Sequence, residues 1–178
     1  ICFLLIRLLI QEKTFVITSV FRSLAICTGL AASLCASAHA TDASQPGVIS
    51  FGTNAEVMAD NLSALCSAQT FRELDPPPVL GITSRSQIDC EGCEYFGAPR
   101  LAEFVFLNDE LAMVWVLVEN DEIPNLEASM TALHGEADVQ STDVDLHTNA
   151  NAGVRRDVPE ALFYAETIEP LIRMQAGG

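Results

Sequence analysis

The chain has 178 residues, of which 49% are hydrophobic and 19% are charged, and its formal net charge is −15 at pH 7. This excess of negative charge repels nucleic acids and anionic lipid surfaces, so we expect neither as a partner. The length is that of a single domain with one hydrophobic core.

Residues 20–40 have the pattern of a cleaved secretory signal peptide. Arg22 precedes an apolar run over residues 24–34, and Ala38 and Ala40 then provide the small side chains at which signal peptidase cuts. Charged and polar residues interrupt every window of about 20 residues in this region, so the pattern does not predict a transmembrane helix. We therefore expect a periplasmic or secreted protein without stable insertion into a membrane.

The segment of residues 1–19 lies upstream of this signal and begins with isoleucine. We interpret it as a doubtful upstream extension. The remaining residues 41–178 are expected to form one mature domain. It has six arginines, no lysine and 23 acidic residues, which gives a formal net charge of −17. The acidic residues are scattered rather than gathered in a tail, a pattern typical of a solvated acidic surface.

The first regular element of the mature domain is predicted to be a helix, after a loose leader over residues 41–50. Thr53 and Glu56 have the spacing of a capping box, in which the Thr53 side chain accepts the N–H three residues on. The apolar residues that follow recur at helical spacing, namely Met58, Leu62, Leu65 and Cys66. They predict a helix over residues 54–69 with Cys66 on its buried face.

A loop with three consecutive prolines at residues 76–78 separates this helix from a group of strands. Three strands are predicted here, over residues 86–96, 100–107 and 111–118. The last two are joined by the polar residues 108–110, which suit a tight hairpin turn. The third strand, LAMVWVLV, is apolar on both alternating faces. It should therefore lie in the middle of a sheet that is covered on both sides.

The rest of the domain is predicted to hold a second helix, two more strands and a short terminal helix. Pro124 suits a first helical turn and Gly135 a helix end, so the second helix spans residues 124–134. The later elements are a strand over 143–147, a strand over 161–165 and a helix over 169–174. The order helix, three strands, helix, two strands predicts an α+β fold. It would be a single layer-packed domain with an antiparallel sheet of about five strands and two main helices.

The stretch DCEGCEYFG places Cys90 and Cys93 in a CxxC pattern. A thioredoxin-type redox centre needs its first cysteine at a helix N-terminus, but Gly97 and Pro99 leave no room for a helix here. The neighbouring acidic residues should also raise the thiol pKa values rather than lower them. A structural zinc site needs four ligands, and the CxxC pair has no partner pair in the mature chain.

We therefore expect a structural disulfide between Cys66 and one cysteine of the CxxC pair, because exported chains meet an oxidising environment. Residues three apart in a regular strand point to opposite faces, which favours Cys66–Cys90 and leaves Cys93 as a free thiol or an intermolecular link. A bulge at Gly92 would change this parity. A Cys90–Cys93 link and a metal or redox function are the alternatives.

Other polar residues offer little chemistry in the sequence. His134 and His147 are interpreted as ordinary surface residues. The two arginines at residues 155–156, beside Asp157 and Glu160, are interpreted as a local surface charge cluster. The sequence contains no nucleophile elbow, zinc-protease motif, phosphate-binding loop or dinucleotide-binding turn. It therefore predicts no catalytic residue, no metal site and no cofactor.

The strands carry more apolar side chains than two helices on one side would cover. The candidates for an interaction face are Phe104, Phe106, Met113, Trp115 and Leu117. Trp115 lies at the centre of the most apolar strand, and aromatic residues at the centre of a patch concentrate binding energy. We expect some of this set to be incompletely buried and to meet another protein or a second copy of the chain.

Together these features predict a small, acidic, exported binding or accessory module without catalytic activity. The alternative is a thiol-redox or metal-binding envelope protein that uses Cys66, Cys90 and Cys93. In its order of elements the domain resembles small envelope modules, such as outer-membrane-assembly lipoprotein domains and proteinaceous enzyme inhibitors. That resemblance is one of architecture alone, and it implies binding of another protein through a sheet face.

Overall fold

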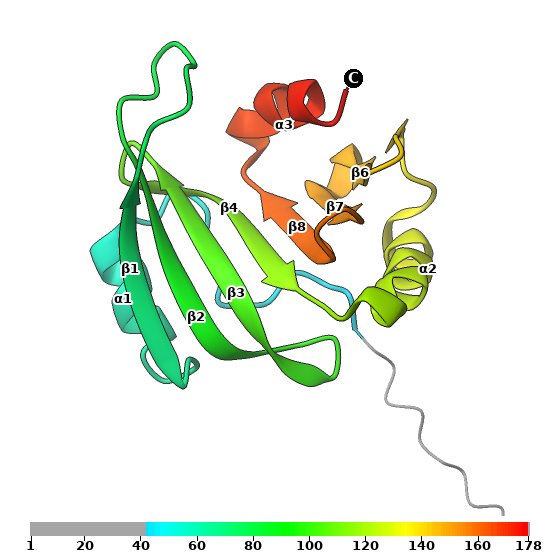
Figure 1. The fold of residues 1–178 in the computed structure, drawn as a ribbon, viewed down its shortest axis with the longest axis horizontal. Helices are drawn as coiled ribbons and strands as arrows, with labels where there is room; N and C mark the ends of the chain where they lie inside the picture. Colours follow the sequence, from blue (N-terminus) through cyan, green and yellow to red (C-terminus); the bar gives the residue numbers. More distant parts are fainter. Residues whose placement is uncertain (1–41, 178) are drawn as a thin grey trace, which may run out of the picture. The chain divides into compact units, whose positions relative to one another are not determined.

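The computed structural model describes residues 42–177, so the predicted signal peptide and upstream extension lie outside the described residues. The described domain has an α+β fold with an antiparallel sheet (Figure 1), as predicted. The sheet has eight strands, however, rather than about five. The prediction missed the strands at residues 68–74, 139–140 and 152–155.

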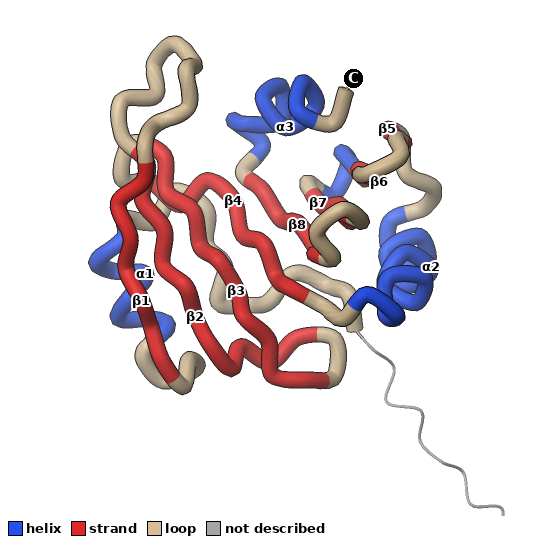
Figure 2. Tube along the Cα trace, viewed as in Figure 1, coloured by secondary structure: helices blue, strands red, loops and turns tan. Residues whose placement is uncertain are grey.

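The strands lie in the order β1-β2-β3-β4-β8-β7-β6-β5 (Figure 2). All neighbours in this order are antiparallel. Their bounds are β1 Ala68–Leu74, β2 Arg85–Tyr95, β3 Ala98–Leu107, β4 Glu110–Leu117, β5 Val139–Gln140, β6 Val144–His147, β7 Ala152–Arg155 and β8 Glu160–Tyr164. The helices of the described part are α1 Ala55–Leu62, α2 Ile123–His134 and α3 Glu169–Gln175, with short 3-10 turns η1 Asn120–Glu122, η2 Thr148–Ala150 and η3 Glu166–Ile168.

The hairpin between β3 and β4 sets the centre of the sheet. Its turn residues Asn108 and Asp109 have positive φ angles of 52° and 67°, a conformation that asparagine and aspartate tolerate better than most residues. This confirms the predicted tight turn. Strand β4 then lies between β3 and β8, and most of its residues are buried. The central position that its apolar sequence predicts is thus confirmed.

Helix α1 is shorter than predicted, and its cap is different. Asn54, not Thr53, is the N-cap, because its side-chain oxygen accepts a hydrogen bond from the Val57 N–H at 2.9 Å. The helix ends at Leu62, and the chain turns into β1, which pairs with β2 over seven residues. Local helical spacing predicted a helix to residue 69, but pairing with β2 satisfies the backbone hydrogen bonds of this segment and overrides it.

The two faces of the sheet are covered by different elements. We call them the α1/α2 face and the α3 face. The α1/α2 face carries Phe104, Val114 and Phe163 and buries side chains of both helices, such as Met58 and Leu126. Opposite residues in an antiparallel pair point to the same face, and Val114 pairs with both Phe104 and Phe163. The main core therefore lies between this face and α1 and α2.

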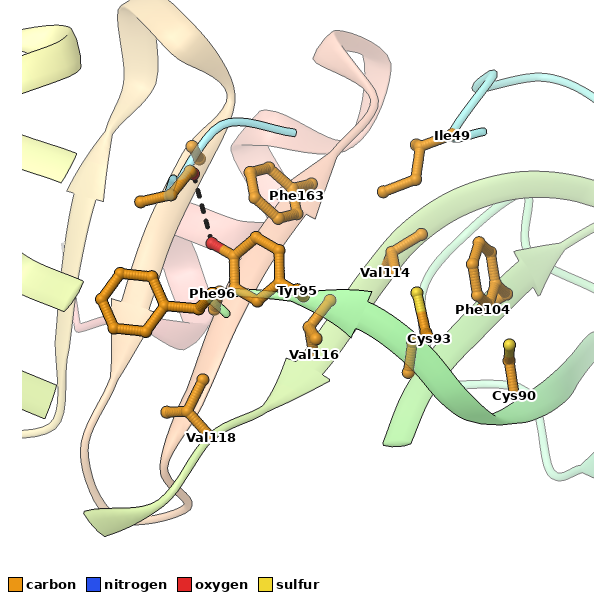
Figure 3. Packing of buried hydrophobic residues seen from close by; sticks show 14 of the residues in the cluster. Ile49, Cys90, Cys93, Tyr95, Phe96, Phe104, Val114, Val116, Val118 and Phe163 are labelled. Carbon is orange, nitrogen blue, oxygen red and sulfur yellow. Dashed lines mark hydrogen bonds between the residues drawn. The ribbon is translucent and has the colours of Figure 1, made fainter. Parts of the chain in front are cut away.

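The α3 face has a second, smaller cluster. It joins Val105, Met113, Leu162 and Tyr164 of the sheet to Ile172 of α3. The segment before α1, predicted as a loose leader, also adds to the main core, because Ala43 and Ile49 are buried. The Tyr95 hydroxyl donates a hydrogen bond to the Ala43 carbonyl oxygen at 3.2 Å (Figure 3).

Candidate functional site

The cysteines form a structural feature on the α1/α2 face. Cys66 and Cys90 are joined by a disulfide with their Cα atoms 5.2 Å apart, and Cys93 is a free, buried thiol. The pairing of β2 with β3 shifts between Glu91 and Cys93, where Gly92 has a φ of 80°. Because of this bulge, Cys90 and Cys93 point to the same side of β2, beside Phe104 (Figure 3).

The environment of Cys93 is unfavourable for thiol chemistry. Its side chain is only 4% exposed, and burial, with a further contribution from Glu94, raises its pKa above the ordinary value. A thiol with a raised pKa holds little of the thiolate that attacks disulfides or binds metals. The CxxC pair therefore lacks the electrostatics of a redox centre.

The five candidates for an interaction face are divided between the two faces of the sheet. Phe104 and Phe106 have no exposed surface and belong to the core of the α1/α2 face. Met113, Trp115 and Leu117 lie on the α3 face, where Met113 is buried and the other two are partly exposed. The five residues thus do not form one surface. The pairing of Phe104 with Val114, fixed by the hairpin turn, places Phe104 away from Trp115.

Trp115 lies under a charged group. The guanidinium carbon of Arg155 is 5.5 Å from the centroid of the Trp115 ring, a cation–π arrangement. Two hydrogen bonds of 2.7 and 2.9 Å to the Asp157 carboxylate hold Arg155 in place. A cavity of about 250 Å³ lies beside the ring and is bounded by Ile172 of α3 and by Ala176, which follows this helix. The Trp115 ring therefore contacts the guanidinium of Arg155 and also borders a small cavity.

Glu160 is a buried carboxyl group next to this cluster. It is 5% exposed, and its Oε2 atom lies 3.5 Å from Nη1 of Arg155 but accepts no hydrogen bond. Burial raises the pKa of Glu160 to about 7. Arg155 opposes this shift, and Glu103 adds to it. The residues predicted as a surface charge cluster thus include a buried carboxyl group whose pKa is raised.

Replacing Glu160 by glutamine is expected to remove a pH dependence of stability. An acid with a raised folded pKa stabilises the fold most below its unfolded pKa, and this contribution is lost as the pH rises through the folded pKa. Here the window runs from about 4.5 to about 7. Relative to Glu160→Gln, the wild type should lose about 2 to 3 kcal/mol of unfolding free energy between pH 5 and pH 8.

Urea unfolding of both proteins at the two pH values measures this difference. Glu56→Gln, the same change at an exposed position, serves as the matched control. If the difference in unfolding free energy between Glu160→Gln and the wild type is the same at pH 5 and pH 8, the prediction is contradicted.

The two histidines were predicted to be ordinary surface residues, and for His147 this prediction is wrong. His147 is 2% exposed, its Nδ1 atom is buried without a hydrogen-bond partner, and its ring centroid lies 5.8 Å from that of His134. Burial and then His147 lower the pKa of His134. The alternation of polar and apolar residues in β6 predicted that His147 lies on a solvated side of the strand. In the structure, α2 packs over that side of the sheet.

A cavity of about 540 Å³ lies between α1 and the edge strand β1. We call it the β1 groove. Ala55 and Ala59 of α1 form one wall, Gln69 and Phe71 of β1 form the other, and Ile88 of β2 is a further lining residue. Figure 1 shows β1 as the outermost strand at the end of the sheet where α1 lies.

The sequence explains why this groove is open. The α1 residues that face β1 are alanines, which do not reach across to the strand, whereas Met58 and Leu62 fill the core. A single hydrogen bond of 3.2 Å, from Gln69 Nε2 to the Ala59 carbonyl oxygen, bridges the two walls. The Phe71 side chain is left 56% exposed.

The charged residues that line the β1 groove are acidic. They are Glu56 at the start of α1 and Asp109 in the turn between β3 and β4, and neither lysine nor arginine lines the cavity. Sequence reasoning missed this site because the predicted helix extended over residues 68 and 69. The signal that would have found β1 is the pair Thr70 and Phe71, which are typical strand formers.

Within residues 42–177, no three histidine, cysteine or acidic side chains are grouped so that they could hold a metal ion. In the same range of residues, none of the helices has the length and apolar character needed to cross a membrane.

The chain was compared with known proteins in three ways, and no protein-family model, curated protein or solved structure matches it.

Proposed function

We propose that the chain is a non-catalytic binding module that holds another protein at the β1 groove. The observation that carries this proposal is the open edge of β1 beside a cavity of about 540 Å³, with Phe71 56% exposed at its wall. Exposed aromatic side chains next to a concave apolar surface are typical of protein-binding sites. The Cys66–Cys90 disulfide supports an exported location, because such bonds persist in oxidising compartments.

The edge supports binding better than the α3 face does. On that face the Trp115 ring is covered by Arg155, so a partner would have to displace an internal cation before it reached the ring. At the edge, Phe71 has no such cover among the described residues, and the neighbouring positions of β1 are exposed as well. A thiol-redox function is not supported, because Cys93 is buried with a raised pKa.

Site-specific photocrosslinking in the native envelope tests this proposal. A photoreactive phenylalanine analogue at position 71 should crosslink a distinct protein, and the same analogue at position 80 should not. Leu80 is a matched control because it is fully exposed in the loop after β1 but does not line the cavity. Ala59→Phe, which fills the groove, should abolish the crosslink from position 71. Equal crosslinking from both positions, or no effect of Ala59→Phe, would contradict the proposal.

A further inference from the structure

Strand β1 has the features of a template for strand addition. It is the outermost strand of the sheet, and six of its seven residues are exposed. Natural edge strands are usually blunted by proline, lysine or a bulge. The sequence of β1, AQTFREL, contains neither residue, and its pairing with β2 runs without a shift. Its outer backbone N–H and C=O groups are therefore in a regular arrangement that another strand can pair with.

The groove lies where the side chains of an added strand would point. Side chains alternate along a strand, so every second residue of an added strand would face the α1/α2 side of the sheet. Phe71 pairs with Ile88, which belongs to the core on that side, so Phe71 points to the same side. An apolar side chain of the added strand would therefore enter the cavity between Phe71 and Ala59.

The charges at the groove determine what kind of segment fits. Glu56 and Asp109 line the cavity, and Glu73 lies two residues after Phe71 on the same side of β1. The one basic residue of β1, Arg72, is already paired with Asp89 at 2.7 Å and Glu103 at 3.5 Å. A basic occupant would gain favourable interactions with these carboxylates, whereas an acidic one would be repelled.

A second copy of the chain fits this surface poorly. Pairing two β1 edges would bring two acidic groove rims together, and residues 42–177 of each copy carry 23 acidic residues against six arginines. Like charges across an interface disfavour association. The occupant is therefore better sought among basic proteins.

On the basis of the proposed function, we infer that β1 accepts an extended basic segment of another protein by strand addition. The segment pairs with the outer edge of Ala68–Leu74, inserts one apolar side chain between Phe71 and Ala59, and places basic side chains near Glu56 and Asp109. Backbone pairing supplies the affinity, while the cavity and the acidic rim supply the selectivity.

Binding of synthetic peptides to the purified protein tests this inference. The probe is a fluorescent eight-residue peptide in which lysine or arginine alternates with leucine or phenylalanine. Binding should be saturable and should weaken as salt is added. The same peptide with glutamate in place of its basic residues should not bind. Methylating every second backbone amide of the peptide gives two variants, one for each set of alternate amides. Only the variant methylated at the N–H groups that donate to β1 should lose binding.

Variants of the protein locate the peptide. Phe71→Ala should weaken binding about tenfold or more, as expected for an aromatic anchor. Leu80→Ala, an equally apolar change at a fully exposed position outside the groove, should leave the affinity unchanged. The double variant Glu56→Gln, Asp109→Asn should weaken binding a few-fold and reduce its salt dependence. Thermal unfolding of each variant shows that the fold is retained.

Three outcomes would overturn the inference. They are no binding of the basic peptides at millimolar concentration, equal binding by Phe71→Ala, and association of the chain with itself through Phe71 in sedimentation experiments. The proposed function fails separately, if the photocrosslink from position 71 is absent or survives Ala59→Phe. A crosslinked partner whose contact segment is neither extended nor basic would leave the proposed function standing and reject strand addition.

Discussion

Replacing Phe104 by alanine is expected to lower the free energy of unfolding by about 3 to 5 kcal/mol. Phe104 has no exposed surface and lies on β3 in the main core, opposite Val114. The change removes a large apolar side chain and leaves a cavity that a strand held on both sides cannot close. Urea unfolding measures the loss as a lower midpoint with an unchanged slope.

Trp115→Ala is the matched comparison on the other face. Trp115 is partly exposed in the folded chain, so its side chain gains less from burial on folding than a fully buried one does. Its cost should therefore be smaller than that of Phe104→Ala, although the tryptophan ring is larger. Equal or larger destabilisation by Trp115→Ala would contradict the division of the candidate residues between a closed face and a partly open one.

Removing the disulfide with the double variant Cys66→Ala, Cys90→Ala is expected to destabilise the chain by about 3 kcal/mol. The bond joins residues 24 positions apart, and closing a loop of this length restricts the unfolded chain by an amount of this order. Reductant should destabilise the wild type by a similar amount and leave the double variant unchanged. Unfolding curves of both proteins with and without reductant provide the measurement.

Cys93→Ala is the control for this prediction, because it removes a thiol without removing the crosslink. It should retain the sensitivity to reductant of the wild type. The disulfide links Cys66, two residues before β1, to the neighbouring strand β2. Its loss should therefore also increase hydrogen exchange in β1 more than in β4, since β1 has a sheet neighbour on one side only. If the double variant is as stable as the wild type, the predicted stabilisation by the Cys66–Cys90 disulfide is contradicted.

Local signals of the sequence were enough for several elements. The LAMVWVLV run predicted a central strand because only a strand covered on both sides can bury residues on both faces. The polar turn at residues 108–110 predicted the hairpin, and Pro124 with Gly135 predicted a helix that the structure places at Ile123–His134. The pairing of Cys66 with Cys90 was also favoured from sequence spacing. For the hairpin turn and the second helix, the determining interactions lie close together in the chain.

The β1 groove could not be predicted in this way. Thr70 and Phe71 favour a strand only weakly against the helical spacing that precedes them, and residues 68–74 form a strand because β2 offers seven residues to pair with. Residues Ala55 and Ala59 look like ordinary helix residues until β1 lies opposite them, where their small size leaves a cavity. The groove exists only because two segments that are joined by a turn pack on the same strand.

By itself, then, the sequence determined an α+β class, an acidic surface, the central hairpin, the second helix and the preferred disulfide. The tertiary structure alone decided the eight-stranded sheet, the face on which each candidate side chain lies, and the burial of His147 and Glu160. The physical reason is that a strand's face and its burial depend on its register with its neighbours and on the helix that covers it. Those partners lie tens of residues away in the sequence, where spacing and propensity carry no information about them.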